Sequence, residues 1–441
     1  MRLLIVCAFF VICSGAVAQT SSISDFAALR QTLESSNLGL KEMDSKVEEL
    51  EAQKSEALRL LVPQFSFRST AATAKDRLLS GTPLFGGEQY NIYSQEFGAS
   101  WTLLKGGAIW SKLQLFGAQA KLLEIERNIL KRDLNLQLIS IGFSISVLQE
   151  KLKVYERLLA AQEKMIGISR VREIRGNDPK STRLQFEVLA EKTKALTENT
   201  QNLIQKKGLE LAEILNFSGE KIDIPKLQIN YTKVEAIGTE FLGELEKPQS
   251  RAQTLELKRA QVQRDSQSYL TQIEVAEHWP SLSLAGAWGS STNRFSDSFR
   301  SDAFGWKVGL ELTLPLFSGL SSFADRKVQA EKETQTRINF EAVRLRDQRQ
   351  LSQRYEDLKS ILRLIKIEQK NRKMSSVAFE ESTKDYSRGF IPFTSVFESQ
   401  RGLLDSEIQF LETSQRLIDV LIEIKKLRDE NWEILLAAFG F

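Results

Sequence analysis

The stretch "LELTLPLFSG", residues 310–319, begins with the pattern of a strand and ends with a stop signal. Its leucines alternate with polar residues, which is the period of a strand with two unlike faces. Pro315 ends the hydrogen-bonding ladder because it has no N–H to donate, and Gly319 marks a turn. From residue 320 to residue 388 there is no further proline or glycine. The pattern therefore predicts a strand that leads directly into one very long helix.

The same arrangement occurs twice in the chain. A second alternating strand ends at Gly106 and Gly107, and two further motifs recur at a similar offset: "VPQFSFRSTA" (62–71) with "WPSLSLAGAW" (279–288), and "REIRGNDPKST" (172–182) with "DYSRGFIPFTS" (385–395). Repetition at a fixed offset is the signature of duplicated units. Each half is predicted to contain a strand, a loop, a strand, a long helix, a turn and a return helix.

The helical segments carry a heptad pattern. Apolar residues step by three and four from Leu134 to Leu159 and again from Leu351 to Ile365, which predicts coiled-coil packing. Leucines at 189, 196 and 203 recur by sevens in the first return helix. At 1.5 Å per residue the long helices would each reach about 95–100 Å.

These patterns divide the chain into five parts. We expect a signal peptide at 1–18, a first repeat at 19–216, an irregular link at 217–250, a second repeat at 251–428 and a C-terminal tail at 429–441. Within the repeats we expect a lead-in helix at 23–61 with a counterpart at 251–277, strands at about 62–72, 94–105, 280–291 and 304–316, and helical hairpins at about 107–216 and 319–428.

The N-terminus has the features of an export signal. A positive start at Arg2 is followed by an apolar stretch and by the small residues "AVA" at 16–18. The alternative, a membrane anchor, would need about 20 apolar residues, and the apolar run is shorter. A lipid-attachment signal is not expected because Ile12 precedes Cys13. Both cysteines, Cys7 and Cys13, lie in the predicted signal peptide, so the mature chain has no thiol.

Composition argues against several functions. The 60 lysines and arginines and the 57 acidic residues nearly balance and are interspersed, so the basic footprint of a nucleic-acid-binding protein is missing. The single histidine, His278, stands beside a predicted strand entrance with no Ser/His/Asp set around it. We therefore expect no catalytic, metal-binding or cofactor-binding residues, no cofactor, and a protein that is not an enzyme.

The strands have one apolar and one polar side. Lipid-facing positions on the second and fourth strands would be Phe97, Ala99, Trp101, Leu103, Val308, Leu310, Leu312 and Leu314. A strand pair half buried in a soluble sheet has the same alternation, so the strands alone leave both interpretations open. In lipid, the two open edges of a four-stranded sheet would need partners. Three copies would supply twelve strands, which is wide enough for an aqueous lumen.

The duplicated layout, the "LTLPLFSG" strand exit and the "YSRG" tip at 386–389 together resemble the TolC-type outer-membrane efflux protein family, over nearly the whole mature chain. The resemblance implies a mixed α/β membrane protein: a homotrimer with a 12-stranded transmembrane β-barrel, four strands per chain, continued by a coiled-coil tunnel of helices. It implies a passive exit duct in the lipid of the outer membrane with a large periplasmic portion. The implied partners are a periplasmic adaptor and an inner-membrane transporter.

The resemblance also directs attention to the helix tips at 171–183 and 385–398 as a gate. Candidate residues are Arg172, Arg175, Gly176, Asp178, Ser181, Arg183, Asp385, Tyr386, Arg388, Gly389 and Glu398. By position in the family, Glu398 stands at the second of two constriction carboxylates. Ser395 replaces the first, and Ile391 replaces an arginine of the family. The structural alternative is that the glycines cap helices and the arginines favour the helix C-terminal dipole.

One other function explains much of the pattern. An exported coiled-coil scaffold of the cell envelope, without pore activity, would have the same signal peptide and the same helices. It does not explain why alternating strand pairs recur in both halves. The loops at 73–92 and 292–303 are expected to face the outside of the cell.

Overall fold

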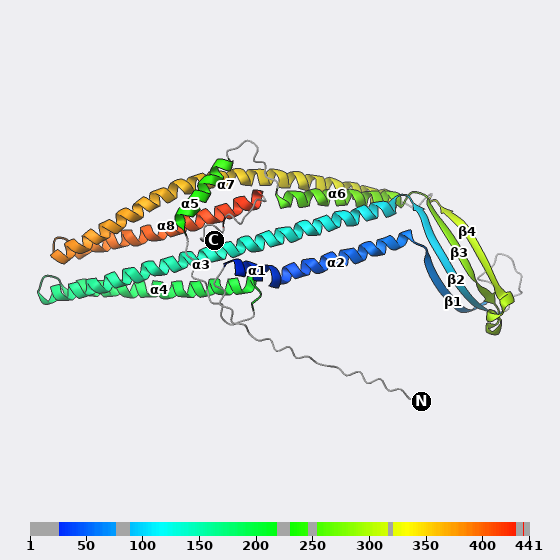
Figure 1. The fold of residues 1–441 in the computed structure, drawn as a ribbon, viewed down its shortest axis with the longest axis horizontal. Coiled ribbons are helices and arrows are strands. Elements are labelled where there is room, and N and C mark those ends of the chain that lie inside the picture. Colours follow the sequence, from blue (N-terminus) through cyan, green and yellow to red (C-terminus); the bar gives the residue numbers. More distant parts are fainter. Residues whose placement is uncertain are drawn as a thin grey trace, which may run out of the picture.

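The computed structural model describes residues 26–75, 89–217, 230–245, 254–315, 321–428 and 435. The molecule is elongated, with a small sheet at one end and two helical hairpin tips at the other (Figure 1). The predicted signal peptide, Gly319 and most of the C-terminal tail lie outside the described residues.

The chain contains eight labelled α-helices and four strands within the described ranges. The helices are α1 (Phe26–Ser36), α2 (Leu38–Leu58), α3 (Ala108–Ile174), α4 (Lys180–Ile214), α5 (Tyr231–Leu245), α6 (Leu255–Ala276), α7 (Ser321–Arg388) and α8 (Phe393–Arg428). The strands are β1 (Gln64–Lys75), β2 (Gln89–Lys105), β3 (Ser281–Thr292) and β4 (Phe304–Thr313), with short 3₁₀ helices η1 (Arg59–Leu61), η3 (Phe295–Phe299) and η4 (Ser301–Ala303).

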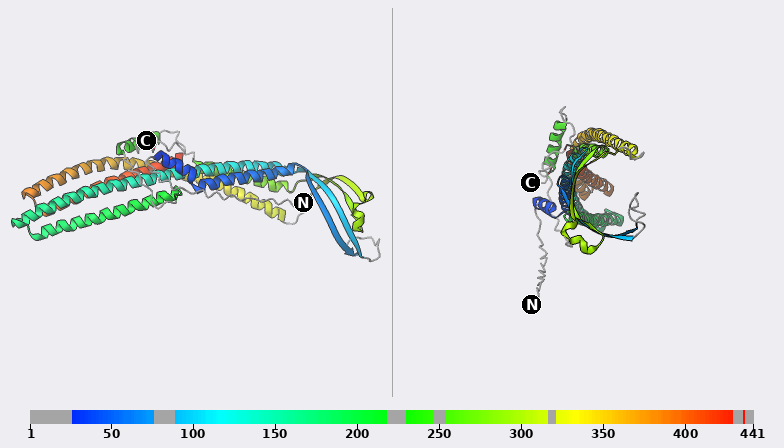
Figure 2. Two further views of the ribbon diagram at one scale, coloured as in Figure 1. Left: turned by 60° about the horizontal axis from the view of Figure 1, so that its bottom comes forward. Right: turned by 90° about the vertical axis from the view of Figure 1, so that its right-hand side faces the viewer.

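The four strands form one antiparallel sheet in the order β1-β2-β3-β4. The sheet is curved and has a concave side (Figure 2). β2 starts at Gln89, earlier than the expected residue 94, and β1 continues to Lys75. The pairing of these extensions shortens the loop that we expected at 73–92. A β-bulge between Thr102 and Leu104 changes the register near the end of β2, so Leu104 pairs with Leu282 and Leu103 occupies the bulge.

Each half then enters its long helix. Gly106 and Gly107 have φ values of 52° and 84°, a left-handed region that glycine adopts without a steric penalty. A Cβ on Gly106 would also lie 2.5 Å from Trp279 Cβ, so this turn requires glycine. In the second half β4 ends at Thr313, and Pro315 follows it outside the ladder.

The long helices α3 and α7, with 67 and 68 residues, pack against α4 and α8 as two antiparallel hairpins (Figure 1). The main core lies near mid-length, where buried residues such as Leu138 and Ile145 of α3, Leu358 of α7 and Leu417 of α8 meet. A partly buried ion pair joins the halves: Arg132 Nη2 of α3 lies 2.7 Å from Glu256 Oε1 of α6.

Two expectations about helices were wrong. The lead-in helix expected at 23–61 is broken at Asn37, whose side chain accepts a hydrogen bond from the N–H of Leu40 and donates one to the carbonyl of Ile214. Asn37 thereby caps the start of α2. The link expected to be irregular contains α5, because Val234, Ile237 and Phe241 form an apolar stripe that is buried against the core.

Candidate functional site

The two hairpin tips end in the same backbone motif. At the end of α3 the N–H groups of Gly176 and Asn177 donate to the carbonyls of Glu173 and Arg172, and Gly389 and Phe390 repeat this pattern at the end of α7. This is the Schellman cap, in which a left-handed residue closes the helix. Gly176 and Gly389 both adopt this left-handed conformation, with φ values of 73° and 85°. The capping role considered for these two glycines is therefore confirmed.

Side chains from both hairpins meet at one point of the tips. The guanidinium of Arg172 binds both carboxylate oxygens of Asp178, at 2.8 and 3.1 Å, and donates through Nη1 to the backbone carbonyl of Tyr386 at 3.1 Å. The Tyr386 hydroxyl donates to Asp178 Oδ2 at 2.6 Å. Because Arg172 and Asp178 belong to the first hairpin and Tyr386 to the second, this network, called the tip tie below, joins the two hairpins of one chain.

The tip tie is electrostatically favourable. Burial opposes ionisation of Asp178, but the hydrogen bonds from Arg172 and Tyr386 prevail and hold the pKa of Asp178 below its ordinary value. Burial, followed by the hydrogen bond to the Asp178 carboxylate, raises the pKa of Tyr386 to about 12. At neutral pH the aspartate is therefore charged and the phenol is a donor. Charge-assisted hydrogen bonds of this kind are stronger than neutral ones.

An apolar cluster supports the tip tie from the side of the helices. Met165, Phe186, Tyr386 and Val396 are buried together. The ring of Phe186 lies 5.8 Å from that of Tyr386 and 4.6 Å, edge to face, from that of Phe393. The Arg172 guanidinium lies 4.9 Å from the centre of the Tyr386 ring. The tyrosine ring is thus contacted by both Arg172 and Phe186, and its hydroxyl donates to the carboxylate.

The other predicted residues lie outside the tip tie. Arg183 binds Glu173 at 2.8 Å and Glu187 at 2.5 Å, both within the first hairpin. Asp385 is half-buried, and the remaining candidates are exposed: Arg175, Ser181, Arg388 and Glu398. The sequence had not singled out the carboxylate partners of Arg183 or the packing of Phe186. The spacing of Arg183 and Glu187, four residues apart on a helix, was a usable signal.

The opposite end of the molecule exposes a continuous apolar surface. The convex side of the sheet carries a row of aromatic rings on neighbouring strands, in which Phe67 lies 4.7 Å from Phe97 and Phe97 lies 5.9 Å from Trp288. Val308, Leu310 and Leu312 extend this surface along β4 and are each about two-thirds exposed. Soluble monomers seldom expose contiguous apolar patches of this kind.

Within the described ranges, no helix combines the length and the apolar character needed to cross a bilayer. No three acidic or histidine side chains of the described residues gather where a metal ion would bind.

The chain matches known proteins in one family and one fold. Residues 248–427 match the family described as outer membrane efflux protein. No curated protein sequence gives a significant match.

Several solved structures have the same fold. The outer membrane protein VceC of Vibrio cholerae aligns with a TM-score of 0.77 at 12% identity, over 92% of this chain and 96% of its own. The CmeC outer membrane channel of Campylobacter jejuni aligns with a TM-score of 0.75 at 13% identity, over 91% and 84%. The MtrE outer membrane channel of Neisseria gonorrhoeae, solved in its open state, aligns with a TM-score of 0.72 at 16% identity, over 91% and 88%.

Proposed function

We propose that the chain belongs to the outer membrane efflux protein family, whose model matches residues 248–427, and that it is the passive exit duct of a tripartite export system. It is an outer-membrane protein with a large periplasmic helical part. Three copies would assemble into a 12-stranded barrel continued by a helical tunnel. Two of the solved neighbours, CmeC and MtrE, are outer membrane channels, which favours transport over catalysis.

The exposed convex face of the sheet is the observation that carries this proposal. Its aromatic row and its leucines suit lipid, and the polar side of the same strands suits water. The strands have 12, 17, 12 and 10 residues, and a tilted strand crosses the hydrocarbon core with about 9–11. A coiled-coil scaffold in water would leave this face uncovered.

The tip tie supports a gate at the periplasmic end. An iris of helix ends closes when neighbouring hairpins are joined and opens when the joins are released. Arg172, Asp178 and Tyr386 would hold the second hairpin against the first in the closed state. Glu398, exposed on α8, would form a ring of three carboxylates at the narrowest point and favour cations.

Energy and choice of cargo would come from partners. A periplasmic adaptor and an inner-membrane transporter would engage the helical end, since a passive duct has no energy source of its own.

Single-channel recording of the purified, signal-cleaved protein in planar bilayers tests the proposal. We expect small, cation-preferring openings from wild type. A folded, heat-resistant oligomer that never inserts or conducts would refute the duct and favour the coiled-coil scaffold.

A further inference from the structure

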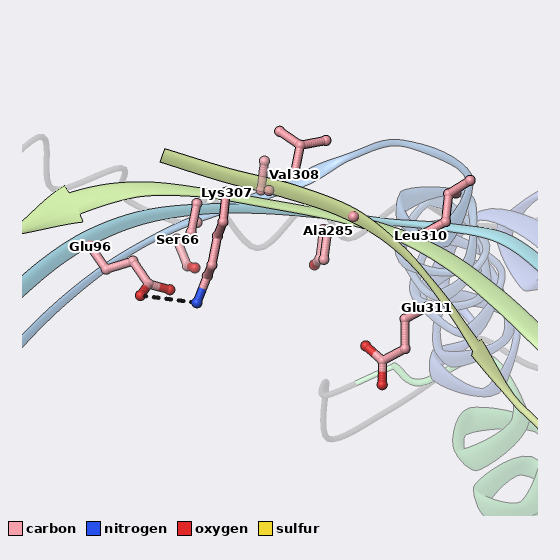
Figure 3. Close-up of a pocket in the computed structure, with 13 residues that line it drawn as sticks. Ser66, Glu96, Ala285, Lys307, Val308, Leu310 and Glu311 are labelled. Carbon is pink, nitrogen blue, oxygen red and sulfur yellow. Dashed lines mark ion pairs between the residues drawn. The ribbon is translucent and has the colours of Figure 1, made fainter. Parts of the chain in front are cut away.

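The concave face of the sheet carries few charged side chains, and only some of them pair with each other within the chain. Lys307 Nζ of β4 lies 3.7 Å from Glu96 Oε2 of β2. Figure 3 shows both side chains on the concave side, with Glu311 on the same side and with Val308 and Leu310 on the other. Lys307 reaches across β3 because the positions between, Ala287 and Gly289, carry little or no side chain.

Three charges on this face remain outside that ion pair: Lys105 at the end of the inner strand β2, and two of opposite sign, one on each edge strand. Arg68, on β1, lies on the same face of the sheet as Glu96, the residue directly opposite it on β2. Glu311, on β4, lies on the same face of the sheet as Ser283, the residue directly opposite it on β3. Both side chains are exposed, and neither forms an ion pair with another described residue. β1 and β4 are the two edges of the sheet.

We propose that Arg68 of one copy pairs with Glu311 of the next copy, and that this pair fixes the register of the seam between β1 and β4. The inference deepens the proposed function and rests on it, because the seam exists only in a closed ring of this chain. The partner is a second copy, and the recognition is one guanidinium to one carboxylate beside two complementary strand edges.

The backbone restricts the seam independently of charge. Full use of β4 requires its ten residues to pair within the twelve of β1. The apolar sides of both strands must also stay on the convex face, which allows only every second register. Two registers meet both conditions. One places Arg68 opposite Glu311, and the other places Arg68 opposite Gly309, two residues from Glu311.

Closure of a ring gives the same two solutions. With the strand pairings of this sheet, twelve strands close at a tilt of roughly 45° in the first register and roughly 35° in the second, both within the range of known barrels. In the first register the two charges face each other directly, and in the second they are diagonal neighbours. A directly opposed pair of opposite charges is the more stabilising arrangement, so we assign the first register.

Paired cysteines measure the register without relying on activity, because the mature chain is expected to contain no cysteine of its own. In the assigned register Ala71 faces Val308 across the seam, so the Ala71→Cys/Val308→Cys protein should form disulfide-linked dimers and trimers under mild oxidation. In the other register Ser69 faces Val308, and Ser69→Cys/Val308→Cys should cross-link instead. Two residues along a strand exceed disulfide reach, so the two double variants distinguish the registers.

Charge exchange tests the ion pair itself. In a Glu96→Gln background, where the exchanged side chain at position 68 meets no carboxylate of its own sheet, Arg68→Glu and Glu311→Arg should each lower the temperature at which the oligomer dissociates on a gel, and the double exchange should restore most of the loss. Glu96→Gln, which removes a carboxylate from the same face but not from the seam, is the control and should leave the Ala71–Val308 cross-link unchanged.

The outcomes separate this inference from the proposed function. Conducting channels that cross-link only through Ser69 and Val308, or whose charge exchange gives no rescue, would overturn the seam assignment and keep the duct. Oligomers that cross-link through Ala71 and Val308 but do not conduct would support the seam and refute the duct.

Discussion

Removal of one hydroxyl should loosen the proposed gate. Tyr386→Phe keeps the ring between Arg172 and Phe186 but deletes the 2.6 Å hydrogen bond to Asp178. A hydrogen bond to a charged group contributes about 1.5–3 kcal/mol. If that contribution is made only in the closed state, its loss shifts the equilibrium between closed and open states by about 10- to 150-fold per subunit. Single-channel recording should show correspondingly more frequent long or large openings.

Arg183→Gln is the matched control for this experiment. It also removes charge-assisted bonds at the tip, but its partners Glu173 and Glu187 belong to the same hairpin. The hairpins should therefore stay joined and the conductance should stay near wild type. The reasoning is refuted if Tyr386→Phe conducts like wild type, or if Arg183→Gln opens the channel to the same extent.

Three further outcomes are expected. The tip tie should persist from about pH 4 to about pH 10. Because the pKa of Asp178 is lowered, its contribution to stability is present above the ordinary aspartate pKa and is lost as pH falls through the lowered pKa. Because the pKa of Tyr386 is raised to about 12, its contribution is complete below the ordinary tyrosine pKa and is lost as pH rises through 12, so conductance recorded against pH should rise only outside this window. Gly389→Ala should open the channel more than Gly176→Ala. Both substitutions strain a left-handed residue by about 1–2 kcal/mol, but only the Cβ at 389 would meet a neighbouring side chain, 3.1 Å from Arg172 Nη1. Equal conductance in the two variants would contradict this. Divalent-cation block of conductance should weaken in Glu398→Ala, and block that is unchanged would show that this carboxylate does not line the constriction.

Local sequence predicted local structure well. The alternation around Leu310 and Leu312 indicated a strand with one apolar face, and both side chains are exposed. Leu310 lies on the convex side of β4 (Figure 3), and Leu312, two residues further along the strand, has the same side. The absence of helix breakers indicated α7, which ends at Arg388 as expected. These features depend on contacts within a few residues, which periodicity and turn chemistry report directly.

The tip tie was not predictable at the level of contacts. Asp178 and Tyr386 are 208 residues apart in the chain, so their meeting depends on how two long hairpins pack. The sequence placed both among the candidates but gave equal weight to Arg175 and Arg388, which the structure leaves exposed. A tip motif identifies which residues are near a turn, and only packing decides which of them face the neighbouring hairpin.

The leucine repeat on α4 shows a related limit. Leu196 and Leu203 follow a heptad spacing but are about 38% and 39% exposed in the single chain. The positions buried against α3 include the smaller Ala190, Thr193 and Thr200 instead. A period identifies an apolar face, but it does not identify the partner of that face. The exposed leucines are the side of α4 that further copies of the chain would cover in the proposed assembly.

The tip tie also explains why the two repeats had to diverge at their tips. In the alignment of the two tip motifs, Arg172 corresponds to Asp385, Asp178 to Ile391 and Tyr386 to Glu173. The backbone caps, by contrast, are the same in both halves. Two identical tips would present the carboxylate of Glu173 to Asp178 where the tyrosine hydroxyl now donates, and like charges placed together repel. The fold of a tip therefore tolerates exact repetition, whereas a bond between two tips requires a donor on one and an acceptor on the other.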